Sequence, residues 1–128
     1  MSVSAGAQEF APGTRYDPRI PTLETVVGHA PGDVITTPED ITAYLEALAA
    51  AAPDRTRLVE YARTWEGRPL HLLAIASPGR MARLDEVKAA VQKLADPRQL
   101  AAGEGERLVA ELPVITMVMA AVHGNETT

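Results

Sequence analysis

Residues 114–126 read VITMVMAAVHGNE, a run of nine uncharged residues followed at once by a histidine and, three positions later, a glutamate. Residues 114–122 alternate little between apolar and polar side chains, which predicts a strand buried on both faces. Strands of that kind occur at the centre of sheets that helices cover on both sides. This stretch therefore predicts an α/β fold with helices flanking the sheet.

The side chains that follow this strand have the chemistry of metal ligands. Zinc accepts imidazole nitrogen and carboxylate oxygen, and a catalytic site uses three protein ligands and leaves one position for water. Gly124 and Asn125 tolerate positive φ, so the chain can fold back and aim His123 and Glu126 at one point. Open α/β sheets bind ligands at the carboxyl ends of their strands, where this pair lies. On the residues alone, two metal ligands and an ordinary polar loop end remain alternatives.

Local signals predict the other elements. Thr37 is a candidate N-cap with Pro38 at the first helical position, and apolar residues then recur at helical spacing until Pro53. Two strands are expected over 58–64 and 70–76, joined by a turn in which Gly67 can adopt positive φ. Further helices are expected over 81–94 and 106–112.

Together these elements predict an α/β fold with a mixed sheet flanked by helices. Residues 1–36 are rich in proline and glycine and are expected to form an extended amino-terminal arm. Residues 37–128 are expected to form one domain, or a large part of one. A central strand without its later neighbours would expose backbone and apolar groups, so we expect the isolated chain to be marginally stable or to self-associate.

Three other polar groups are interpreted as structural. His29 lies among small residues of the arm and is expected to be a loop residue. His71 alternates with leucines in a strand and is expected to be partly buried or at an edge. Glu66 and Arg68 flank a turn and are expected to form a solvated ion pair.

Composition excludes several classes of function. The formal net charge is −5, with 12 basic and 17 acidic residues, which argues against binding nucleic acid or an anionic membrane surface. Cysteine is absent, so disulfides and thiolate ligands are excluded. No apolar run reaches the length of a membrane helix. Ala5-Gly6-Ala7 has the form of a signal-peptidase site, although no apolar segment precedes it.

Several segments together resemble the zinc metallocarboxypeptidase family, the carboxypeptidase A-like peptidases. The His-Gly-Asn-Glu sequence at 123–126 is similar to the family's first metal motif, His-x-x-Glu after a central strand. Residues 63–70, with their Glu-Gly-Arg turn, resemble an early hairpin of the family. Residues 81–86 and 94–98 are similar to segments of a large bacterial subgroup. The resemblance spans roughly residues 15–128.

The resemblance implies a zinc carboxypeptidase-like fold and a function. It implies that His123 and Glu126 bind Zn²⁺, that the bound water attacks a peptide substrate near its free carboxyl terminus, and that the protein is secreted or periplasmic. Family members take a second histidine, an arginine and a glutamate from further along the chain. The resemblance therefore implies that residues 37–128 are the amino-terminal part of a zinc carboxypeptidase-like catalytic domain. We expect this fragment to be inactive alone and assign no catalytic residue within it.

Two other functions stay open. The first alternative is a non-catalytic binding or assembly module that has kept the fold, although the intact His-x-x-Glu motif favours an enzyme. The same fold and metal motif also occur in a branch of zinc-dependent deacylases that cleave N-acyl amino acids. The hairpin and the Asp-Pro-Arg segment at 96–98 favour the peptidase branch.

Overall fold

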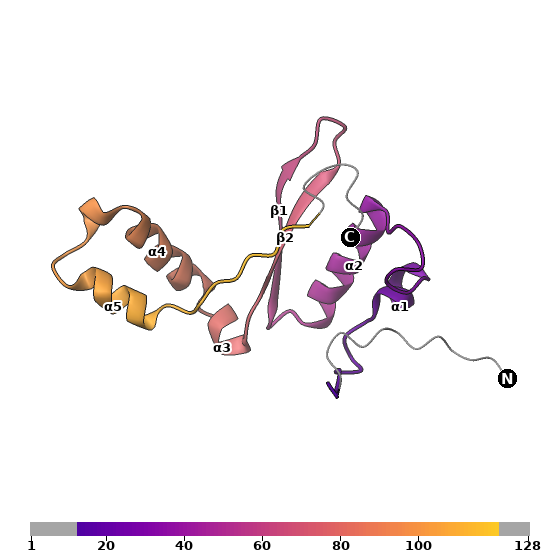
Figure 1. The fold of residues 1–128 in the computed structure, drawn as a ribbon, viewed down its shortest axis with the longest axis horizontal. Coiled ribbons are helices and arrows are strands. Elements are labelled where there is room, and N and C mark those ends of the chain that lie inside the picture. The colour runs from indigo at the N-terminus through magenta and orange to yellow at the C-terminus, as the bar shows by residue number, and fades with distance from the viewer. Residues whose placement is uncertain (1–12, 121–128) are drawn as a thin grey trace. The chain divides into compact units, whose positions relative to one another are not determined.

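The chain divides into two compact units, Met1–Ala76 and Ser77–Thr128. A computed structural model describes residues 13–120, so that unit 1 is described from residue 13 and unit 2 up to residue 120. Figure 1 shows the elements of both units along the chain. His123 and Glu126 lie outside the described residues.

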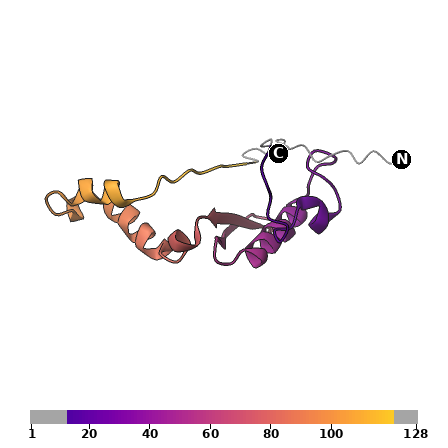
Figure 2. The same ribbon diagram turned by 90° about the horizontal axis from the view of Figure 1, so that it is seen from below.

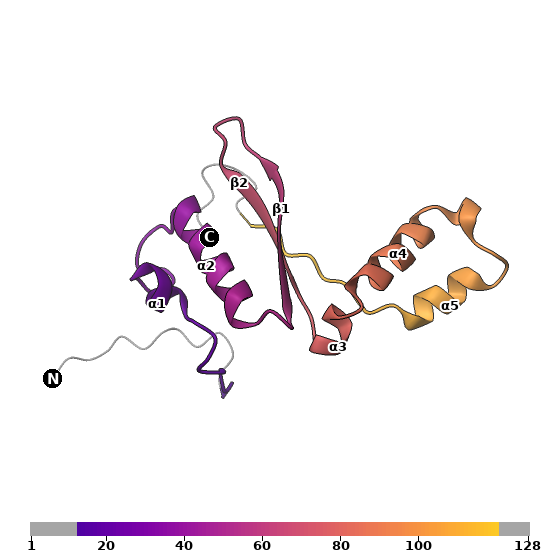
Figure 3. The ribbon, with the colours of Figure 1, turned by 180° about the vertical axis from the view of Figure 1, so that it is seen from behind.

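Unit 1 combines two helices with a β-hairpin. Its elements are α1 (Leu23–Val27), α2 (Pro38–Ala51), β1 (Thr56–Arg63) and β2 (Pro69–Ile75). Helix α2 contacts α1 and both strands, and Figures 2 and 3 show it lying along the hairpin. Helices and strands therefore occur together in one packed unit, as the α/β class requires.

The arm is not extended throughout, because α1 lies within it. Thr22 caps this helix by accepting a hydrogen bond from the Thr25 N–H at 3.2 Å. Gly28 ends it with a φ of 88°, and its N–H donates to the Glu24 carbonyl. An N-cap threonine and a C-terminal glycine are ordinary helix limits, but five residues are too few to show a helical period.

Helix α2 begins as its sequence predicts. The Thr37 hydroxyl oxygen accepts from the Asp40 N–H at 3.1 Å, and the Asp40 carboxylate accepts from the Thr37 N–H at 3.4 Å. This reciprocal capping box satisfies N–H groups that have no partner within the helix. Pro38 occupies the first helical position, where its missing N–H costs nothing. The predicted helix start is confirmed.

The predicted hairpin is also confirmed. β1 pairs antiparallel with β2, and a β-bulge interrupts the register between Glu60 and Ala62. The turn is closed by the Thr64 N–H donating to the Arg68 carbonyl at 2.9 Å. Gly67 has a φ of 81°, a region that residues with a Cβ rarely adopt. Local turn chemistry therefore fixes the hairpin.

Unit 2 is helical over its described elements. These are α3 (Pro78–Met81), α4 (Leu84–Ala95), the 3₁₀ turn η1 (Pro97–Gln99) and α5 (Glu104–Glu111). The helix expected over 81–94 is thus divided, because α3 ends before α4 begins at Leu84. Leu108 of α5 is buried, and Lys93 of α4 bonds Glu104 of α5 at 2.5 Å. The two helices are therefore in contact, and an ion pair joins α4 to α5.

The strand expected over 114–122 is not present in its described part. Residues 113–120 carry no strand, and Val114 and Val118 are 96% and 89% exposed. A strand is held by its ladder to a neighbour, and in residues 13–120 the one sheet is the two-stranded β1–β2. The prediction of a buried central strand is therefore wrong for residues 114–120, and the described sheet is antiparallel, not mixed.

Little apolar surface is buried in the described chain. Three hydrophobic residues in residues 13–120 are buried, namely Ala52, Met81 and Leu108, and none of the described side chains is fully buried. Among the helices there, none is both long and apolar enough to span a bilayer. The two units therefore depend strongly on backbone hydrogen bonds and helix caps.

Removal of the capping hydroxyl tests the start of α2. Thr37→Ala is expected to weaken the first turn by about 1 kcal/mol, because the Asp40 N–H loses its acceptor. Amide exchange at Asp40 and Ile41, followed by NMR, should become about fivefold faster. In the control Thr42→Ala, the lost bond runs to the Pro38 carbonyl, and these amides should change little. Equal acceleration in both variants would contradict the capping role.

A methyl group at the hairpin turn tests its backbone conformation. Gly67→Ala should destabilise the hairpin by about 1 kcal/mol or more through its positive φ. A Cβ there meets no atom within 4 Å, so the effect comes from the backbone alone. The same substitution at Gly79, which has no positive φ and lies in α3, should not weaken the hairpin. The measurement is amide exchange at Thr64, and unchanged exchange in Gly67→Ala would refute this account.

Candidate functional site

The residues that the structure describes end at position 120, three positions before His123, the first expected metal ligand. Residues 113–120 lead toward His123 and Glu126 without regular secondary structure. The structure therefore does not place these two side chains, and their role as ligands stays a prediction from the sequence.

The two other histidines lie on separate elements of unit 1. His29 follows α1, and its Nδ1 lies 3.2 Å from the Ala30 carbonyl oxygen. His71 is half-buried on β2, opposite Glu60 in the ladder. The Glu60 carboxylate pairs with the Arg63 guanidinium at 2.7 and 2.8 Å. This carboxylate is therefore not free to bind a metal ion together with His71. Within residues 13–120, no group of three or more potential ligands could hold a metal ion.

Among the buried side-chain nitrogen and oxygen atoms of the described residues, the Nε2 atom of His29 is the one that lacks a hydrogen-bond partner. Such atoms are uncommon in folded proteins, where buried polar groups are almost always paired. The neighbouring Gly28, Ala30 and Pro31 carry no polar side chain that could reach it. His29 therefore remains a loop residue, as its sequence context predicts.

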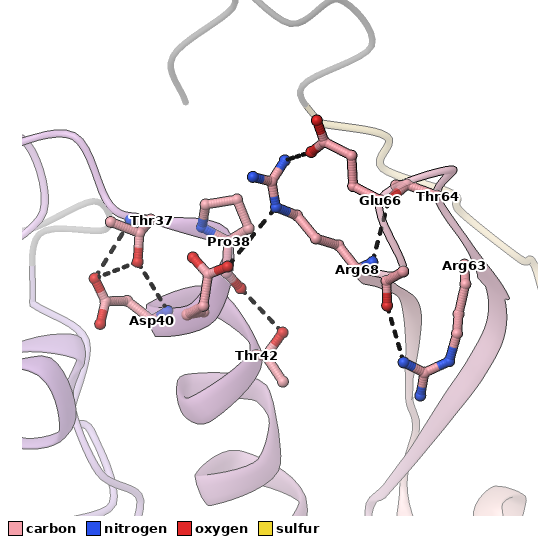
Figure 4. A network of polar contacts seen from close by, with 10 residues as sticks. Thr37, Pro38, Asp40, Thr42, Arg63, Thr64, Glu66 and Arg68 are labelled. Carbon is pink, nitrogen blue, oxygen red and sulfur yellow. Dashed lines mark hydrogen bonds and ion pairs between the residues drawn. The ribbon is translucent and has the colours of Figure 1, made fainter.

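A polar network joins the hairpin turn to the start of α2. Arg68 lies 2.6 Å from Glu66 within the turn and 3.8 Å from Glu39 of α2 (Figure 4). Its own N–H donates to the Thr64 hydroxyl at 3.1 Å. These three charged side chains are 54–72% exposed, so each ion pair is weak. The network positions the turn and has no nucleophile or base held for catalysis.

This network borders a shallow hollow of about 200 Å³. Its lining comes from the first turn of α2 and the beginning of β2, through Pro38, Glu39, Thr42, Arg68 and Pro69. The Arg68 guanidinium is already shared between two carboxylates, so the hollow offers no free cation to an anionic ligand. Its walls are otherwise two prolines and a threonine, and they point to no particular ligand.

Shifted pKa values in the described chain have local causes. Hydrogen bonds from Arg19 lower the pKa of Asp17 to about 2. Asp96 shows the same arrangement, because its hydrogen bonds with Arg98, and then with Gln99, lower its pKa. In each Asp-Pro-Arg sequence the arginine Nε donates back to the aspartate Oδ1, at 3.0 and 2.7 Å. These carboxylates stabilise turns and do not form a catalytic cluster.

A family model of zinc carboxypeptidases matches residues 41–128, more than two thirds of the chain. The chain belongs to the zinc carboxypeptidase family. A search of curated proteins and a search of solved structures found no match. The family that the sequence motifs predict is therefore confirmed, together with a fold of helices and strands consistent with part of a carboxypeptidase-like domain.

The match also locates the motifs of this member of the zinc carboxypeptidase family relative to the described elements. It begins at Ile41 inside α2, includes the hairpin, α4 and α5, and extends over His123 and Glu126. Zinc is the metal of the family in general, and imidazole and carboxylate ligands suit it. The contact between Arg68 and Glu39 was missed from sequence, because it joins two elements that only the fold brings together.

Proposed function

We propose that this chain contributes to a zinc-dependent hydrolase that cleaves peptide bonds, with His123 and Glu126 as two of its metal ligands. The observation that carries the proposal is the family match over residues 41–128, which includes both residues. The spacing His-x-x-Glu, directly after an uncharged apolar segment, agrees with that assignment. Peptides with a free carboxyl terminus are the proposed substrates.

The donor set fits zinc. Imidazole nitrogen and carboxylate oxygen are both common zinc ligands, and Gly124-Asn125 gives the backbone freedom to bring them together. When bound, zinc supplies a water of lowered pKa and polarises a carbonyl group. The role of His123 and Glu126 is to hold and orient the ion. The chemistry of these two residues does not by itself separate a peptidase from a deacylase of N-acyl amino acids.

A catalytic zinc site needs a third protein ligand. In the described part of unit 1, His29 and His71 lie on different elements and neither belongs to a metal-binding cluster. We therefore propose that neither supplies that ligand. It follows that the 128-residue protein should bind zinc weakly and should not hydrolyse peptides.

Zinc titration of the purified 128-residue protein tests the ligand assignment. His123→Ala and Glu126→Gln should each weaken Zn²⁺ binding by at least about tenfold, because loss of a direct ligand exceeds the loss of an outer partner. His29→Ala and His71→Ala are matched controls and should leave binding within about twofold of the unchanged protein. Competition with a chromophoric chelator gives the dissociation constants.

Three results would contradict the proposal. Zinc binding that survives both His123→Ala and Glu126→Gln would remove these residues from the metal site. Loss of binding in His71→Ala or His29→Ala would place the site in unit 1 instead. A protein that binds no zinc at all, yet folds, would favour the non-catalytic binding module.

A further inference from the structure

We draw no further inference here: the strongest candidate, the hollow of about 200 Å³ that residues of α3, α4 and α5 line in unit 2, has arginine, glutamate and apolar side chains in its walls alike, and nothing in the structure shows what covers it.

Discussion

The carbonyl oxygen of Ala52 fixes how α2 leads into β1, and the arrangement of unit 1 depends on it. This oxygen accepts from the N–H groups of Arg55 and Thr56, both at 3.0 Å, and from the Thr56 hydroxyl at 2.7 Å. Ala52 is also the one buried hydrophobic residue in the described part of this unit. Because these hydrogen bonds pair the carbonyl group at the end of α2, they set the direction in which β1 leaves the helix. The ladder of hydrogen bonds with β1 then sets the direction of β2.

The elements that could be predicted from sequence are those whose signals act over a few residues. Thr37 and Asp40 predict the helix start because they bond each other, and Gly67 predicts the turn because few residues accept its φ. The strand prediction for residues 114–120 failed for the opposite reason. Apolar composition there predicts burial, but a strand also requires a neighbour, and composition does not supply one.

The candidate metal site likewise has one part that local sequence predicts and one part that it does not. The pair at His123 and Glu126 could be recognised because its spacing is local and its residue types suit zinc. A third ligand depends on contacts between distant segments, which spacing does not encode. The role of Arg68 shows the same limit, because the sequence predicts its pair with Glu66 across the turn but not its approach to Glu39 of α2.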